Sequence, residues 1–527
     1  MRAAVRALQA SDSGRAYGLP ETITLGNVAV DAEVSGPLNN LRGLVNWQAP
    51  QGDYPARGEI ALSGQQIDFR NTVVQVAGGL VQGEGTLVNG LWNARLNAEG
   101  IQLGEFVDRL QGSTGQAAAA LSGSLDDLSL RGIRGDGTLS AQVAGGTVSG
   151  TATLANGNWL TDLQTAGILL SAFNPQLQGR ASGDVQLSGS LSDLSLAGIR
   201  GSGNIALSQG LASFAGFSPQ LERVNSPLTA AIAWDGRQVQ VQQATSAGFS
   251  ANGVLVPRLE GPGAPTLANL DLNLILRDYD LAALPGPPDG LMLAGRADFT
   301  GRVRGSLSNL ALNGDAALTN LALNDLTFEE RLSGPVTFAA GDRLAVDLTG
   351  DHDRLQVSYG FGTNNIAFDV RTAAQTAQGE TLDAIATGTT EGNILQARLQ
   401  NFPLAALNFP ADGIAGYGQV RGVVDQADIA VDISDLSRPE FMGDLALSNP
   451  GGGYLGVDSF RGRITYANGT ATLVGGNIEQ TNSQGQISRY LLTGRYPQGP
   501  DPEIAGELEV VQGNLQDVLE TAQIFRL

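Results

Sequence analysis

Apolar residues recur at every second position over most of this chain, and this alternation restricts the fold more than any other feature. The segments RQVQVQQ from Arg237, RLAVDLTG from Arg343 and NIAFDVR from Asn365 are clear examples. Successive side chains of a β-strand point to opposite faces, so a period of two predicts strands with one buried face. Frequent Gly and scattered Pro restrict helices to short connectors.

Tight-turn signals separate the alternating segments. Asn-Gly or Asp-Gly dipeptides begin at Asn89, Asn156, Asp235, Asn252, Asn313 and Asn468. Both residues of such a pair tolerate the positive φ of a type I′ turn, which joins neighbouring antiparallel strands. The sequence therefore predicts an antiparallel meander.

The chain also repeats itself. The phrase GSLDDLSLRG from Gly123 returns 66 residues later as GSLSDLSLAG from Gly189, and a longer segment from Gly78 returns from Gly145. Looser copies follow from Gly305 and Gly422. We interpret the phrase as the first strand of each module, which restarts the sheet after a crossover. Repeats that cover their neighbours build elongated arrays.

The repeats predict one continuous array of modules and not independent globules. We expect a flexible N-terminal arm over 1–20, then β modules over 21–122, 123–188, 189–304, 305–421 and 422–527, the last ending in a short turn or helix.

Composition excludes several classes of function. A net charge of −21 disfavours binding to nucleic acid or to an anionic membrane surface. The absence of Lys and Cys excludes a Walker A lysine, a Schiff base, thiolate chemistry and disulfides. The sequence contains no run of 18 or more apolar residues, the length that a membrane-spanning helix needs. The first residues lack the apolar region of a signal peptide.

Candidate reactive residues are few. His352 between Asp351 and Asp353 is interpreted as a hairpin turn, and the carboxylate pairs Asp278/Asp280 and Glu329/Glu330 as solvated surface. A calcium site in GSLDDL is disfavoured because the acidic residues differ between the copies. We therefore expect no enzyme activity, no catalytic residue, no cofactor and no metal.

The apolar face itself is the remaining candidate site. It could be covered by a second sheet in a closed core, or the sheet could curl into an open groove that shelters an apolar ligand. The residues expected to line such a groove are Val148, Leu154, Val239, Val241, Leu272, Leu274, Leu344, Val346, Leu348, Ile366, Phe368 and Val370.

The order of alternating strands, a short Leu-rich turn such as YDLAALPG or FPLAALNF, and a GSL phrase resembles the TamB/AsmA-like proteins of diderm bacteria, from about Ile23 to Leu527. The family belongs to the repeating β-groove lipid-transfer proteins. The resemblance implies an all-β, elongated, curled antiparallel sheet that stands in the periplasm, associated with the inner membrane. It also implies that the groove carries phospholipid toward the outer membrane.

The resemblance further implies support for outer-membrane protein assembly, with a TamA-like barrel as partner. The N-terminal membrane anchor of the family is missing from this chain, which we expect to be a fragment of a longer protein. The alternative function is a closed β-solenoid or sandwich that acts as a structural, adhesin-like surface protein. A carbohydrate-active solenoid enzyme should cluster carboxylates in one module, and the sequence has no such cluster.

Overall fold

The computed structural model describes residues 2–9, 26–37, 40–106, 110–127, 129–173, 177–213, 225–258, 266–283, 292–306, 308–324, 326–375, 381–407, 420–434, 440–452, 455–482, 484–497 and 505–513. The chain divides into two compact units, Met1–Ala268 and Asn269–Leu527.

The first unit consists of strands joined by short turns and single-turn 3₁₀-helices. Its elements are β1 (Arg2–Gln9), β2 (Asn27–Ser35), β3 (Arg42–Ala49), β4 (Ala56–Ser63), β5 (Gln66–Val76), β6 (Gly79–Val88), β7 (Leu91–Gln102), η1 (Leu103–Glu105), β8 (Thr114–Ser124), β9 (Arg134–Val143), β10 (Gly146–Ala155), β11 (Asn158–Leu169), η3 (Leu170–Ala172), β12 (Arg180–Ser190), β13 (Arg200–Leu207), η4 (Gly210–Ser213), β14 (Leu228–Trp234), β15 (Val239–Ser246) and β16 (Phe249–Arg258).

The second unit has the same character. Its elements are β17 (Thr266–Asp280), η5 (Leu281–Ala283), β18 (Leu293–Ser306), β19 (Asn309–Leu323), β20 (Leu326–Thr327), β21 (Arg331–Ala339), β22 (Arg343–Thr349), β23 (Arg354–Gly360), β24 (Asn365–Gln375), β25 (Thr381–Glu391), β26 (Ile394–Pro403), η6 (Leu404–Leu407), β27 (Val420–Asp432), β28 (Glu440–Gly452), β29 (Leu455–Gly456), β30 (Ser459–Ala467), β31 (Thr470–Thr481), β32 (Ile487–Pro497) and β33 (Ala505–Gln512).

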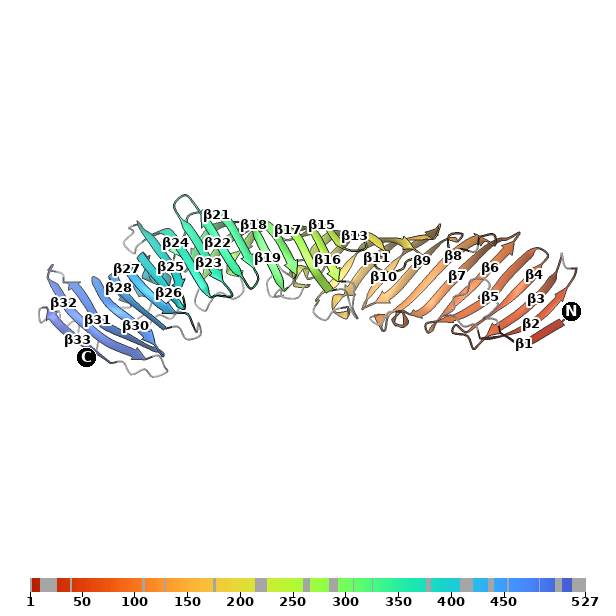
Figure 1. Cartoon of the computed structure of the whole chain (residues 1–527), viewed down its shortest axis with the longest axis horizontal. Coiled ribbons are helices and arrows are strands. Elements are labelled where there is room, and N and C mark those ends of the chain that lie inside the picture. Colours follow the sequence, from red (N-terminus) through yellow and green to blue (C-terminus); the bar gives the residue numbers. More distant parts are fainter. Residues whose placement is uncertain are drawn as a thin grey trace. The chain divides into compact units, whose positions relative to one another are not determined.

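Within each unit most strands pair antiparallel with the next strand in chain order (Figure 1). The exceptions are the two-residue strands β20 and β29, past which β19 pairs with β21 and β28 with β30. Among the described residues no pairing joins distant strands to close the sheet, and no second sheet covers it. The expectation of an all-β, curled antiparallel sheet with short helical connectors is confirmed. The sequence did not exclude a closed core, but the described strands do not form one.

The sequence repeat is also a repeat of backbone conformation. Asn89 and Asn156, 67 residues apart, have φ of 52° and 54°, and Ala77 and Ala144 have 46° and 48°. A bulge between Ala98 and Ile101 in β7 has its counterpart between Thr165 and Ile168 in β11. The run β6–β7–η1–β8 is thus rebuilt as β10–β11–η3–β12.

The GSL phrase has a different structure from the one we expected. In its first two copies only the Gly and Ser belong to a strand, the end of β8 or of β12, and the rest is a loop to the adjacent strand. No crossover precedes or follows it, since β8 pairs with both β7 and β9, and β12 with both β11 and β13. The third copy turns more tightly, with Gly305 paired to Leu310 in the β18–β19 hairpin. The Gly and Ser of the first three copies thus end a strand, whereas Gly422 of the fourth lies inside β27.

The N-terminal arm also differs from its expectation. Residues 2–9 form β1, which pairs antiparallel with β2 between Arg2 and Glu33 and between Gln9 and Asn27. This pairing satisfies the backbone groups along one edge of β2. Residues 10–25 and the expected C-terminal turn or helix after Asn514 lie outside the described residues.

Candidate functional site

The expected lining residues of the second unit lie on one face and in contact across strands. Strand pairing forms three rows, Leu344–Tyr359–Ile366, Val346–Val357–Phe368 and Leu348–Leu355–Val370. Leu272 and Leu274 belong to the same face, because they pair with Val303 and Gly301 of β18. All eight expected positions of this unit are half-buried or buried. We call this surface the apolar face.

The first unit continues the pattern within its own sheet. Val148 pairs with Ala141, Leu154 pairs with Trp159, and both are half-buried. Val239 and Val241 pair with Trp234 and Ile232 on the corresponding face of β14 and β15. The four expected positions of the first unit therefore also share one face.

Aromatic rings on this face lie over glycines, which the sequence analysis did not foresee. The four tryptophans of the chain are each paired with a glycine of an adjacent strand, as Trp47–Gly58, Trp92–Gly123, Trp159–Gly189 and Trp234–Gly201. A Cβ on Gly123 would lie 2.6 Å from the indole of Trp92, and one on Gly189 would lie 2.8 Å from that of Trp159. In the sequence, the recurrence of Trp92 and Gly123 as Trp159 and Gly189 was the signal that could have predicted these pairs.

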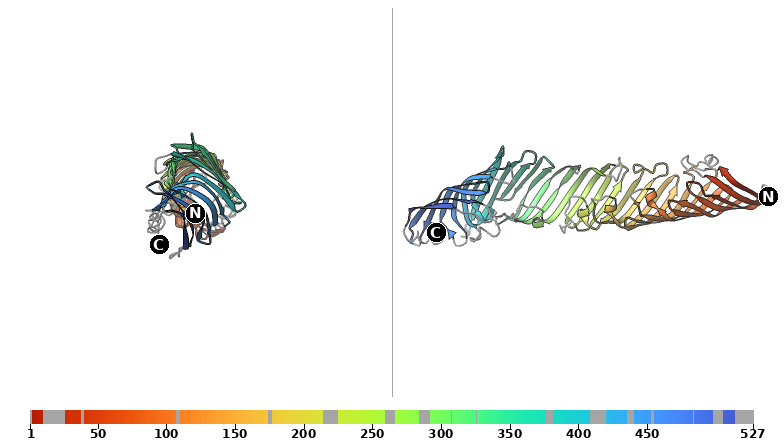
Figure 2. Two further views of the ribbon diagram at one scale, coloured as in Figure 1. Left: turned by 90° about the vertical axis from the view of Figure 1, so that its left-hand side faces the viewer. Right: turned by 90° about the horizontal axis from the view of Figure 1, so that it is seen from below.

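Glycines also let adjacent backbones approach on the apolar face. A Cβ on Gly150 or Gly183 would lie 2.1 Å from a carbonyl oxygen of the neighbouring strand, that of Asp162 or Asn204. Real side chains do not fit there, so these glycines permit the sheet to bend toward this face. The left view of Figure 2 shows that the strands of the second unit, coloured teal to blue, are curved along their length.

The opposite face carries ion pairs. Arg463 contacts Asp444 at 2.8 Å, Arg398 contacts Asp428 at 2.6 Å, and Arg302 pairs with Asp271. The hydrogen bond from the guanidinium of Arg463 holds the pKa of the Asp444 carboxyl below its ordinary value of 3.8. These pairs are exposed cross-strand ladders, which contribute little energy individually and keep this face solvated.

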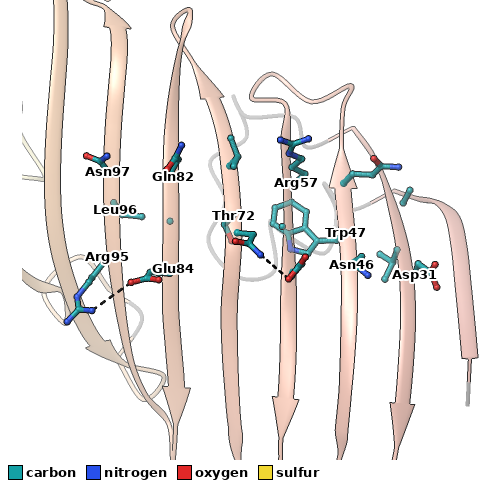
Figure 3. Close-up of a pocket in the computed structure, with 18 residues that line it drawn as sticks. Asp31, Asn46, Trp47, Arg57, Thr72, Gln82, Glu84, Arg95, Leu96 and Asn97 are labelled. Atoms are coloured by element: carbon teal, nitrogen blue, oxygen red, sulfur yellow. Dashed lines mark hydrogen bonds and ion pairs between the residues drawn. The ribbon is translucent and has the colours of Figure 1, made fainter.

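A cavity of about 1120 Å³ lies along β2–β7 of the first unit (Figure 3). Its lining includes the paired row Asp31–Asn46–Glu59 of the polar face. Figure 3 shows Arg95 directed at Glu84, 3.7 Å away, as their ion pair requires. The lining also includes Val30, Trp47 and Leu96, so charged, amide and apolar groups are mixed in this cavity.

The apolar face of the second unit is covered at one margin and open at the other. At the covered margin Leu332, Leu348 and Ala427 are at most 1% exposed, in a cluster with residues of β20, η5 and η6. At the other ends of the same strands, Phe361 is 39% exposed and contacts Phe338 and Tyr359 edge-on. This open margin gives access to the half-buried rows between them.

The remaining sequence candidates are structural. Residues 350–353 connect β22 to β23, so the hairpin turn expected around His352 is confirmed. Glu329 is not the solvated group we expected, because its carboxylate accepts hydrogen bonds from the backbone N–H groups of His352 and Asp353. Asp278 and Asp280 are exposed at the end of β17, and Asp278 pairs with Arg296 at 2.8 Å.

Within the described ranges, no group of three or more His, Asp or Glu side chains is placed to hold a metal ion. Nor does any helix in this part of the chain have the length and apolar character needed to cross a membrane. No family model, curated protein or solved structure matches the chain.

Proposed function

We propose that this chain is a non-enzymatic envelope protein whose apolar face shelters the acyl chains of phospholipids and carries them between the inner and outer membranes. The observation that supports this most is the sharing of one half-buried face by all the expected lining residues of each unit. The face opens to solvent at the margin with Phe361 in the second unit.

The physical need for such a face is large. Each acyl CH₂ exposed to water costs about 0.8 kcal/mol, so two chains of roughly 16 carbons cost on the order of 20 kcal/mol. A barrier of that size makes unaided crossing of an aqueous gap very slow. A trough that covers the tails and leaves the headgroup in water lowers it without any reactive residue.

Periplasmic location, association with the inner membrane, a role in outer-membrane protein assembly and a TamA-like barrel partner belong to the same proposal. They rest on the resemblance to the TamB/AsmA-like proteins, carried by the GSL phrases and the Leu-rich turns. The closed adhesin-like array has less support, because the described strands leave their apolar face without a second sheet.

The test is phospholipid capture by the purified chain, followed by mass spectrometry of the extracted lipid. Val346→Asp places a charge on the apolar face, between Val336 and Val357. We expect it to lower binding of a labelled phosphatidylethanolamine about tenfold or more, since desolvating an unpaired carboxylate costs more than the 1.4 kcal/mol of one decade.

Ala345→Asp is the matched control. It adds the same charge one residue earlier in β22, on the face where Ala345 pairs with Thr337 and Ser358. Binding should remain close to that of the unchanged chain. Equal losses in both variants, or a chain that neither carries nor accepts lipid, would contradict the proposal.

A further inference from the structure

We propose that the tip of the β19–β20 hairpin, residues 326–330, is a clasp that closes the covered margin of the second unit and must be released for that stretch of the apolar face to take up an acyl chain. This inference rests on the proposed function and adds a gate to it.

The clasp contacts segments that are not its sheet neighbours. β20 pairs with β19, yet the carbonyl oxygen of Thr327 accepts a hydrogen bond of 2.9 Å from the hydroxyl of Thr372 in β24. Near the same tip, the amide of Asn324 lies 3.4 Å from the carbonyl oxygen of Ala406 in η6. β20 and β21 lie in line along the same edge of β19, so β22 and β23 separate β20 from β24, and the clasp reaches across the short β22–β23 hairpin.

Two carboxylates fasten the clasp reciprocally to the β22–β23 turn. Asp353, 5% exposed, accepts a hydrogen bond of 2.7 Å from the backbone N–H of Glu329, and its carboxylate lies 2.7 Å from the Thr372 hydroxyl, which shares its one proton between Asp353 and the carbonyl oxygen of Thr327. Glu329 in return accepts from the backbone N–H of Asp353 at 2.9 Å and of His352 at 3.2 Å. These contacts are hydrogen bonds, which can break and reform, and no apolar side chain takes part in them.

Beneath the clasp the apolar face is dry. Leu326 and Phe328 pack into one cluster with Leu348, Leu399 and Val424, all at most 8% exposed. Leu348 belongs to the same face as Val346 and Leu344, which are half-buried farther from the clasp. With the clasp closed, an acyl chain entering from the open margin therefore stops before Leu348. Release of Leu326 and Phe328 would uncover the rest of the face.

The test places a photo-reactive residue on the apolar face. Val370, which lies in the same row as Leu348 and pairs with Leu355 and Ala386, is replaced by the photo-reactive p-benzoylphenylalanine. Phe69 of the first unit, which pairs with Ile60 and Gly85, carries the same label as the reference. The probe is a labelled phosphatidylethanolamine, and crosslinked lipid is measured at each position in the full chain.

The clasp is then tethered or loosened. Asn324→Cys with Ala406→Cys, joined by a short bismaleimide, holds it shut, and the chain has no other Cys. Glu329→Ala and Thr372→Val each remove hydrogen bonds that fasten it, the second with little change in size. Circular dichroism confirms that each variant is folded.

We expect the tether to lower lipid labelling at position 370 about fivefold, and either loosening variant to raise it about fivefold, as the loss of one net hydrogen bond would. Labelling at position 69 should not change. If labelling at position 370 changes neither with the tether nor with the loosening variants, the clasp is overturned, while labelling at position 69 still supports the proposed function. No labelling at either position in any variant overturns the proposed function itself.

Discussion

At the scale of single residues, the apolar face pairs large aromatic side chains with glycines across neighbouring strands. A ring on one strand fills the space that a glycine leaves on the next, as Trp159 does over Gly189 and Phe368 over Gly388. Such pairs cover glycine backbone with aromatic surface, and the sheet stays one layer thick. Because the pairing joins residues about 20 to 30 positions apart, it could not be predicted before the register was known.

This complementarity predicts that Gly189→Ala destabilises the first unit by about 1–3 kcal/mol, since the added methyl group would lie 2.8 Å from the indole of Trp159. Urea unfolding measures the change. Gly362→Ala is the control, because its Cβ would meet nothing nearer than 3.8 Å and its φ is not positive. A loss as large at position 362 would show that glycine itself, and not the indole, sets the effect.

The loop acids give a prediction about pH. The Ser195 hydroxyl, and then its backbone N–H, hold the pKa of Asp193 below 3.8. A carboxyl with a lowered folded pKa contributes stability above about pH 3.8 and loses it as pH falls through the lowered value. Ser195→Ala should raise the pKa of Asp193 toward 3.8, as measured by NMR titration of labelled aspartates. Asp127, held by Ser129 in the other loop, should keep its own titration curve.

At the scale of elements, the strands could be predicted from the sequence and the GSL loops could not. Alternating Leu in GSLDDLSL resembles a strand, but Asp127 accepts hydrogen bonds from the hydroxyl and backbone N–H of Ser129, which bends the chain into a loop. Asp193 and Ser195 form the same contacts in the second copy. Side-chain bonds to the local backbone compete with strand pairing, and the alternation does not reveal them.

Because the two loops have the same internal contacts, exchanging them should be neutral. We expect a chain with residues 125–133 and 191–199 interchanged to unfold within about 0.5 kcal/mol of the original. Replacing either with the tighter turn that follows Gly305 should destabilise it, since Leu125 and Leu191 donate backbone hydrogen bonds to Gly90 and Gly157. Thermal unfolding by circular dichroism distinguishes the two results.

At the scale of the whole molecule, each unit is an array in which most strands contact only their neighbours. The sequence predicted this class, because alternation, turns and repeats all agree. It did not reveal the clasp, since Thr327 and Thr372 carry no pattern that marks a contact across the two strands between them. Periodicity alone predicted the face on which each lining residue lies. It did not predict their unequal burial, because burial depends on how the sheet bends.

Hydrogen exchange should therefore be graded within the second unit. We expect the slowest amides in β21, β22, β26 and β27 near Leu332, Leu348, Leu399 and Ala427, beneath the clasp. β33 should exchange fastest, because nearly all of its residues are exposed. Mass spectrometry of peptic fragments resolves this gradient, and uniform protection across the unit would contradict an array that opens locally.

The placement of tryptophan over glycine has a practical consequence. All four tryptophans of the chain, on β3, β7, β11 and β14, belong to the first unit, and each is paired with a glycine. Tryptophan fluorescence, excited at wavelengths that tyrosine does not absorb, therefore reports on that unit alone in the unaltered protein. Brominated acyl chains, which quench indoles at short range, would dim this signal only when they occupy the first unit. The chain carries its own optical means of telling its two halves apart.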